Sequence, residues 1–495
     1  MSQVDETPAV MNSAMSRFRP AAHFSPNANW INDPNGLVRI GSQFHLFYQK
    51  NPFAPQWGEI SWGHAVSKDL LTWQEQGVAI EATPEEQIFS GSVIRLIDKK
   101  HGGVGGSSPL VAVYTSAYRG TSPLAGEQAQ SIATSDDDGA TWHGFEFNPV
   151  LRRHSANFRD PKVVRYRRGD ETYWIMVAVE AEQHAVVIYR STDLIHWTYL
   201  STFSDERLDE GLWECPDLFE VELDDDPGRS VWVLVINVNP GGPAGGSGTR
   251  YLVGAFDGSS FEWNGTSDWL DWGPDHYAAV SFCDVQPYDR LIIGWMNNWA
   301  YAAETPTIGW NGSLTFPRTL GAFEIGGRIY LTQDPISPPD SALESTRFVG
   351  QLSKESGLTF ELEPGRAVLI SAEITSLFDS FVVSLSSASN DSFELNWDAS
   401  IGELVVDRGG AFSVVGGTTV SNVAHIPLVG PFETTRFKLL VDRNSVEVFA
   451  SHGARSASFL TYPQSEFSSV EVKMPQGTAT FAIERSYLTA KIVGD

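Results

Sequence analysis

Short apolar runs separated by turn residues recur along almost the whole chain, and this pattern constrains the fold more than any other feature. Almost no segment shows the 3.6-residue apolar spacing of a helix. Many short strands at even spacing are typical of a sandwich, a barrel or a propeller, so we expect an all-β protein. The clearest expected strands are residues 44–48, 110–114, 174–179, 185–189, 231–236 and 291–293.

An internal repeat distinguishes among these architectures. The turn-and-aromatic element of residues 67–73 (SKDLLTW) returns at 135–142 and 191–197, and more loosely at 256–261. Polar segments lie between these elements, and their key residues are spaced by 57, 70, 54 and 61 positions. A spacing of this size fits a four-stranded blade, and five such key residues, here called marks, predict a five-bladed β-propeller. In a propeller, equivalent residues of successive blades converge at one end of the central axis. The five marks are Asp33, Ser90, Asp160, Glu214 and Asp275.

The composition of the sequence changes near its end and at its beginning. Residues 333–340 (QDPISPPD) are rich in proline and indicate a linker, which we place at 333–342. Alternating apolar and polar residues then resume, which predicts a C-terminal β-sandwich over 343–495. Residues 1–19 are polar and aperiodic and are expected to form a flexible arm, which leaves 20–332 for the propeller.

Charge and cysteine usage exclude several classes of protein. The chain has 34 Lys and Arg against 61 Asp and Glu, a net charge of −27, which argues against a nucleic-acid partner. Two cysteines cannot build a disulfide scaffold or a four-ligand zinc site, and the 11 histidines show no metal-ligand spacing. We therefore expect no metal and no membrane span, since the apolar runs are short. A homodimer is left open.

The first 20 residues contain no apolar segment of the kind that marks a secretory signal. This favours a cytoplasmic protein, or a secreted one if the chain has been trimmed.

Asp33, Asp160 and Glu214 are the acidic residues among the repeat marks, and each is followed closely by proline. Asp-Pro pairs also begin strands and cap turns, so any one of these acids alone could be structural. Acids at equivalent points of a closed ring, however, crowd negative charge into one hollow, which usually marks a site. Two or three carboxylates without metal ligands suit the cleavage of glycosidic bonds, where one attacks and another donates a proton.

Nine segments in order along the chain resemble motifs of glycoside hydrolase family 32, the invertases, exo-inulinases, levanases and related fructosyltransferases. The resemblance covers about residues 22–480 and implies a five-bladed propeller followed by a β-sandwich. The segments are residues 30–36 (WINDPNG), 57–58 (WG), 61–67 (SWGHAVS), 89–92 (FSGS), 158–161 (FRDP), 213–217 (WECPD), 272–279 (WGPDHYAA), 294–299 (GWMNNW) and 441–449 (VDRNSVEVF).

The resemblance also implies roles for particular residues and no cofactor. Asp33 matches the nucleophile, Glu214 the general acid/base and Asp160 the acid that stabilises the transition state. Arg159 would bind a hydroxyl group and hold Asp160 ionised. The remaining residues expected to bind substrate are Asn32, Gln49, Trp57, Phe89, Ser90, Asp275, His276 and Trp299.

Three neighbouring features leave alternatives open. His276 stands where relatives often carry Phe. It either alters the pH profile or the choice of acceptor, or it is a packing substitution with no role in the site. Cys215 adjoins Glu214 and is more simply explained as a packed side chain than as a thiol nucleophile. Residues 241–248 (GGPAGGSG) lack the features of a phosphate-binding loop and are expected to form a flexible loop.

The expected activity is that of a β-fructofuranosidase. It would remove terminal non-reducing β-D-fructofuranosyl units from sucrose and short fructans, with retention, through a covalent fructosyl-enzyme. The two reacting carboxyl groups should then lie about 5–5.5 Å apart. A fructosyltransferase that makes kestose-type products and a non-catalytic fructan-binding propeller are the alternatives.

Overall fold

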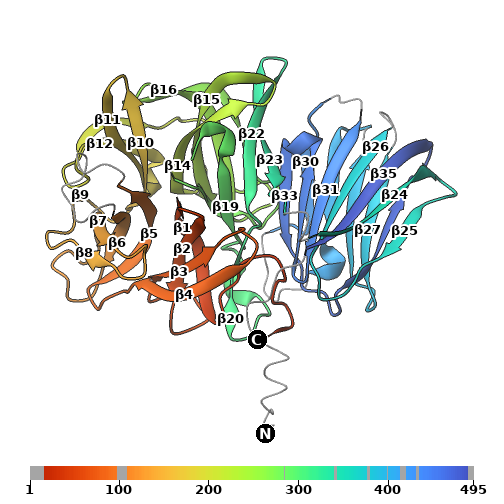
Figure 1. Cartoon of the computed structure of the whole chain (residues 1–495), viewed down its shortest axis with the longest axis horizontal. Helices are drawn as coiled ribbons and strands as arrows, with labels where there is room; N and C mark the ends of the chain where they lie inside the picture. Colours follow the sequence, from red (N-terminus) through yellow and green to blue (C-terminus); the bar gives the residue numbers. More distant parts are fainter. Residues whose placement is uncertain are drawn as a thin grey trace, which may run out of the picture.

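The structure is a computed structural model that describes residues 16–96, 109–283, 285–338, 343–375, 380–398, 400–412, 420–430 and 434–488. Within these ranges the regular structure is almost entirely strands, as expected of an all-β chain. Two lobes lie side by side, the N-terminal one in red to green and the C-terminal one in blue (Figure 1). The short 3-10 turns are η1 (Ala181–Gln183), η2 (Pro287–Asp289), η3 (Ala302–Glu304), η5 (Gly409–Ala411) and η6 (Ser451–Gly453).

In the N-terminal lobe, consecutive strands pair antiparallel in four-stranded runs. The first run is β1 (Asn29–Ile40), β2 (Gln43–Asn51), β3 (Ser61–Ser67) and β4 (Trp73–Ile80), with β20 (Trp310–Asn311) added beside β1. The second is β5 (Glu86–Arg95), β6 (Leu110–Tyr118), β7 (Gln128–Ser135) and β8 (His143–Gly144), with β9 (Leu151–Ser155) on β7. The third is β10 (Phe158–Arg168), β11 (Glu171–Glu180), β12 (Ala185–Ser191) and β13 (Thr198–Phe203).

Two further runs share one nine-stranded sheet, where Leu223 and Ala322 form the parallel bridge between them. One run is β14 (Leu212–Leu223), β15 (Asp226–Asn239), β16 (Gly248–Phe256) and β17 (Phe261–Trp269). The other is β18 (Tyr277–Ser281), β19 (Leu291–Met296), β22 (Arg318–Ile325) and β23 (Arg328–Pro335), with β21 (Ser313–Leu314) on β19.

The first strands of these runs close a ring, because β1 contacts β5, β5 contacts β10, β10 contacts β14, β14 contacts β18 and β18 contacts β1. This is the arrangement of a propeller, and it brings together segments that lie far apart in the sequence. The ring has five members, which agrees with the predicted number of blades, although the sheet order joins two of the runs.

Each strand of the ring carries a β-bulge close to one of the predicted polar marks. The register shifts fall between residues 31 and 34, 89 and 91, 159 and 162, 214 and 217, and 277 and 280. A bulge inserts an extra residue and redirects the neighbouring side chains. Proline has no N–H group to donate to a neighbouring strand, so within a sheet it fits where the hydrogen-bond ladder is interrupted. The prolines that follow the acids lie at such interruptions.

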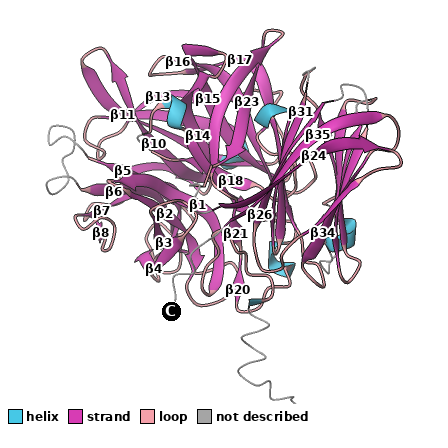
Figure 2. Cartoon of the chain, turned by 45° about the vertical axis from the view of Figure 1, so that its right-hand side comes forward, coloured by secondary structure: helices cyan, strands magenta, loops and turns pink. Residues whose placement is uncertain are grey.

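The C-terminal lobe is a sandwich of two six-stranded sheets around a core of aliphatic and phenyl side chains, turned into view in Figure 2. One sheet contains β24 (Leu343–Ser353), β35 (Thr478–Leu488), β26 (Val368–Thr375), β31 (Thr435–Asp442), β32 (Ser445–Ala450) and β33 (Arg455–Leu460). The other contains β25 (Leu358–Glu361), β34 (Phe467–Lys473), β27 (Phe381–Ser387), β28 (Ser392–Asp398), β29 (Glu403–Asp407) and β30 (Val423–Pro427).

The lobes meet close to the predicted boundaries. Strand β23 continues to Pro335, three residues into the predicted linker, and β24 begins at Leu343. Residues 339–342 of the linker and 1–15 of the expected arm lie outside the described residues. Phe18, within the expected arm, is buried with its ring 5.2 Å from that of Tyr462 in the sandwich. The described helical turns are all too short to cross a bilayer.

Candidate active site

Asp33 lies in the bulge of β1 and is almost fully buried, with 7 % of its surface exposed. Besides the Cys215 thiol, three side chains donate to its carboxylate: Asn32 to Oδ1 at 2.9 Å, and Ser90 and Gln49 to Oδ2 at 2.5 and 3.3 Å. Gln49 also bonds Ser90 and Asn32, so the predicted subsite residues form one network. Burial raises the pKa of Asp33, with Glu214 adding to the rise, whereas the hydrogen bonds from Ser90 and Asn32 oppose it.

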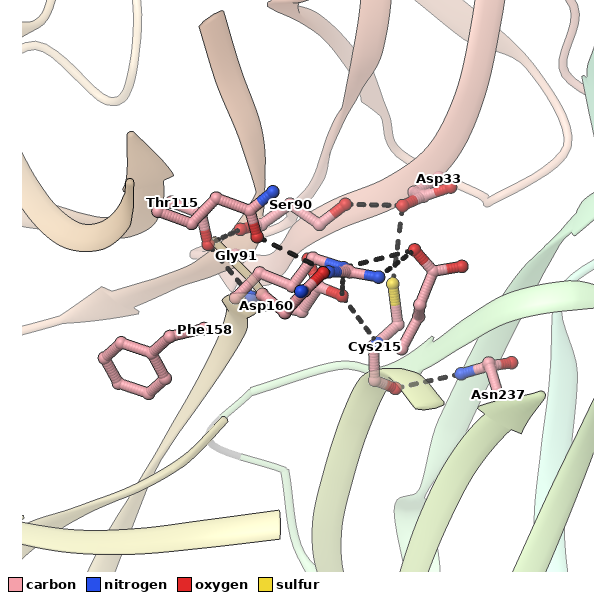
Figure 3. Close-up of polar contacts among 12 residues, drawn as sticks. Asp33, Ser90, Gly91, Thr115, Phe158, Asp160, Cys215 and Asn237 are labelled. Carbon is pink, nitrogen blue, oxygen red and sulfur yellow. Dashed lines mark hydrogen bonds and ion pairs between the residues drawn. The ribbon is translucent and has the colours of Figure 1, made fainter. Parts of the chain in front are cut away.

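Asp160 lies in the bulge of β10 and has a left-handed backbone, with φ at +62°. Its N–H donates to Thr115 Oγ1 at 2.9 Å, and its Oδ2 accepts the N–H of Cys215 at 2.9 Å (Figure 3). These bonds across two neighbouring blades hold a conformation that aspartate tolerates better than most residues. The carboxylate lies close enough to Glu214, on the adjacent strand β14, and to Asp33, on β1, for both to act on its charge.

Glu214, in the bulge of β14, is the most open of the three acids, with 23 % of its side chain exposed against 5 % for Asp160. Arg159 donates to its Oε1 from Nε at 3.2 Å and from Nη2 at 3.0 Å. The hydroxyl of Tyr277 donates to its Oε2. Glu214 is thus held from both sides while it keeps access to solvent.

The three acids gather around Cys215. Its thiol lies 3.4 Å from Asp33 Oδ2 while its backbone N–H bonds Asp160, and Glu214 is its neighbour in the chain (Figure 3). Burial, with the three acids around it, raises the pKa of the Cys215 thiol well above its ordinary value. The residue therefore stays a neutral thiol, which agrees with the packing role and not with a nucleophile.

Burial also raises the pKa of Asp160 to about 7, with Glu214 and Asp33 adding to the rise and Arg159 opposing it. The sequence-based expectation was that Arg159 would hold Asp160 ionised. In the structure the Arg159 guanidinium lies 3.8 Å from Asp160 and bonds Glu214 instead. The arginine is shared between two acids, and its effect on Asp160 is smaller than that of burial.

The predicted aromatic residues lie around this network. Trp57 is half exposed, and its ring meets that of Phe89 at 6.3 Å in an edge contact. Trp299 is half buried and stacks on Trp30 with ring centroids 6.0 Å apart. Trp30 in turn donates from Nε1 to Asn32 at 2.7 Å, which connects the aromatic group to the partner of Asp33.

Asp275 and His276 are not brought to the carboxylates. Asp275 is fully buried and bonds Arg408 at 2.6 Å, the N–H of Leu460 at 2.8 Å and the hydroxyl of Tyr301. It thus joins the propeller to the sandwich. His276 is also buried, with Nδ1 3.2 Å from Thr249 Oγ1, and burial lowers its pKa to about 4. The packing interpretation of His276 therefore fits better than a role in substrate binding.

Sequence reasoning missed two residues that contact the acids. Tyr277 lies within the quoted motif of residues 272–279 but was not selected. Thr115 and its partner Gln130, bonded at 3.0 Å, lie in strands without any motif, and both are fully buried. Only the polar character of these two positions in apolar strands could have indicated them. Among the described residues, no group of three or more potential metal ligands occurs.

Comparisons with known proteins identify the family of this chain. The N-terminal domain model of glycosyl hydrolases family 32 matches residues 23–335, and the C-terminal model matches 342–487. The chain is 37 % identical over 494 residues to the extracellular exo-inulinase of Aspergillus niger, covering 91 % of this chain and 90 % of that protein. It is 36 % identical over 489 residues to a levanase of Bacillus subtilis, covering 93 % of this chain and 68 % of the levanase.

Among solved structures, the exo-inulinase of Aspergillus awamori superimposes with a TM-score of 0.88 at 34 % identity, covering 96 % of this chain and 98 % of that one. The agreement extends over both lobes. On the family models, the relatives and the three-acid site, this chain belongs to glycoside hydrolase family 32.

Proposed function

We propose that this glycoside hydrolase is a β-fructofuranosidase that releases terminal fructose from sucrose and short fructans. The observation that carries the proposal is the gathering of Asp33, Asp160 and Glu214 around Cys215. Such a site has an anionic lining suited to the cationic charge that develops at the anomeric carbon. The relatives named for inulin and levan support a fructan substrate.

In the proposed mechanism, Asp33 attacks C2 of the fructosyl unit and the bond from C2 to the glycosidic oxygen breaks. Glu214 gives its proton to that oxygen, so the leaving sugar departs neutral. The donors Ser90, Asn32 and Gln49 stabilise the carboxylate form of Asp33, which attack requires. Water then attacks C2 and gives its proton to Glu214, which frees Asp33 and releases fructose with retained configuration.

Asp160 and Arg159 are assigned to binding of the fructose hydroxyl groups. Asp160 is fixed by backbone and hydroxyl contacts and lies beside both reacting acids, so it can accept hydrogen bonds from the sugar as charge develops. Arg159 orients Glu214 through Nε and Nη2, while its Nη1 is held by Gln128 and Asn157. Trp57, Phe89 and Trp299 are assigned to the apolar faces of the sugar rings.

The extracellular relatives favour secretion and do not support the expectation of a cytoplasmic enzyme.

The test is a product profile from sucrose, inulin and levan at matched concentrations of fructosyl ends. We expect free fructose from each, first formed as the retained anomer when followed by NMR. Asp33→Asn and Glu214→Gln should each lower kcat by at least about 10³-fold while thermal unfolding stays unchanged. Absence of fructose from all three substrates would overturn the proposal, and kestose in excess of fructose at high sucrose would assign a transferase instead.

A further inference from the structure

The glycine-rich segment 241–248 lies between the two domains. It was expected to be a flexible loop, but Ala244 is buried against the core of the sandwich, and its carbonyl accepts the N–H of Ser421 at 3.0 Å. The segment also closes on itself, since the N–H groups of Gly241 and Gly242 both donate to Gly246 O, at 2.8 and 2.9 Å. It is therefore a compact structure anchored on the sandwich.

Asn298 lies directly against this segment and is fully buried. Its Oδ1 accepts the N–H of Ser247 at 3.2 Å, and its Nδ2 donates to Gly245 O at 3.2 Å and to Pro274 O at 2.7 Å. Pro274 precedes Asp275, which is bonded to the sandwich as described above. One amide thus connects two segments that are docked on the sandwich.

The close approach requires glycine at position 246. A Cβ atom there would lie 2.1 Å from Asn298 Oδ1, and the backbone φ is +67°. A real Cβ contact is never so short, so Asn298 would have to move.

Trp299 follows Asn298 and is held by the same segment. Its N–H donates to Ser247 Oγ at 3.2 Å, and its ring contacts Trp295 at 4.8 Å and Trp30 at 6.0 Å. Trp30 bonds Asn32, the partner of Asp33. A continuous set of contacts therefore runs from the sandwich, through segment 241–248 and Asn298, to the aromatic residues beside the nucleophile.

We propose that segment 241–248 and Asn298 are positioning residues through which the sandwich domain fixes Trp299 beside the active site and so sets the affinity for substrate. This inference rests on the proposed function for its kinetic readout. It assigns the sandwich domain, which supplies none of the three acids, a specific part in substrate binding. It predicts that disturbing the contact changes KM more than kcat.

The experiment compares Gly246→Ala with Gly265→Ala as a matched control. Gly265 also has a positive φ, +90°, but a Cβ there meets nothing within 4 Å. We expect Gly246→Ala to raise KM for sucrose and inulin about three- to tenfold, the scale of one aromatic contact, with kcat within about twofold. Gly265→Ala should leave both constants unchanged. Equal KM values in the two variants would overturn the proposal.

Ser247→Ala is the second variant, in case Gly246→Ala does not fold. It removes only the acceptor of the Trp299 N–H and should raise KM about threefold. An unchanged KM in a folded Ser247→Ala protein would also count against the inference.

A second readout does not depend on turnover. The emission of Trp299 is obtained by subtracting the spectrum of a Trp299→Phe counterpart, with acrylamide as the quencher. Gly246→Ala should make Trp299 more accessible to acrylamide, and Gly265→Ala should not. If the unaltered chain releases no fructose, the proposed function fails, but the quenching measurement still tests whether segment 241–248 positions Trp299. Unchanged quenching in Gly246→Ala would overturn the positioning inference.

Discussion

Arg159 holds Glu214 with two N–H groups, at 3.2 and 3.0 Å to the same carboxylate oxygen. The arginine and the glutamate come from bulges of adjacent ring strands, β10 and β14. The guanidinium is largely buried, so its position is set by the protein and not by solvent. Arg159 therefore fixes one carboxylate oxygen of the proposed acid/base, while the Tyr277 hydroxyl bonds the other.

Replacing Arg159 by lysine should separate charge from geometry. Lysine keeps the positive charge but presents a single ammonium group instead of a planar fork, so Glu214 loses its fixed orientation. We expect kcat/KM for sucrose to fall by about 10²-fold. Arg207→Lys is the control, because Arg207 forms an exposed pair with Asp205 and should change kcat/KM by less than twofold. Equal effects of the two changes would remove the orienting role.

The raised pKa of Asp160 makes a prediction about stability and pH. Its pKa of about 7 in the folded protein exceeds the ordinary value of 3.8. At pH values between these two, the folded state therefore keeps a proton that the unfolded state has lost. The contribution of Asp160 to stability is therefore lost as pH rises from about 4 to 7. Asp160→Asn cannot ionise, so its free energy of unfolding relative to the unaltered protein should increase over this range, at most about 1.4 kcal/mol per pH unit.

Urea unfolding of both proteins at pH 4, 5.5 and 7 measures this difference. Ile370→Val, an apolar change in the core of the sandwich, serves as the control and should give a difference independent of pH. A pH-independent difference for Asp160→Asn would contradict the assigned electrostatics.

Much of the site could be predicted because a propeller repeats. Asp33, Asp160 and Glu214 stand at equivalent points of the repeat, and this becomes closeness in space once the ring closes. The local backbone could not be predicted in the same way. The left-handed conformation of Asp160 and Cys215 depends on bulges in paired strands, and a bulge leaves no reliable trace in a single sequence.

Asp275 and His276 show a second limit. In the motif of residues 272–279, Asp275 and His276 precede β18, which begins at Tyr277, so the strand does not determine where their side chains point. Tyr277 reaches Glu214, whereas His276 faces Thr249 and Asp275 bonds Arg408 in the sandwich. Of this motif, only Tyr277 bonds one of the three acids, and a sequence motif alone does not show which of its side chains do so.

The polar contact between the domains was not predictable from either domain alone. Arg318, at the start of β22, is fully buried and donates to Asp271 at 2.9 Å and to Glu447 of the sandwich at 2.8 Å. The three residues belong to no common motif, and they meet only because the two lobes dock.

Arg318→Met should therefore be strongly destabilising. The change leaves buried Asp271 without its cation and Glu447 with His23 alone, and breaking a buried pair in this way costs about 3–5 kcal/mol. Arg436→Met is the matched control, since Arg436 forms an exposed pair with Glu373 and should cost less than about 1 kcal/mol. The free energies come from urea unfolding at pH 7. A loss below about 1 kcal/mol for Arg318→Met would show that water replaces the pair.

His23 gives the domain contact a defined pH dependence. Burial alone would lower its pKa, but hydrogen bonds to Asp442 and Glu447 raise it to about 9. Because this value exceeds the ordinary 6.5, the stabilisation is fully present below about pH 6.5 and is lost as pH rises to about 9. His23→Gln should therefore reduce the free energy of unfolding by more at pH 6 than at pH 9.5. His425→Gln is the control, because His425 forms an exposed pair with Glu403 and its loss should have little effect at either pH. An equal loss of stability at both pH values for His23→Gln would show that His23 is neutral in the folded protein.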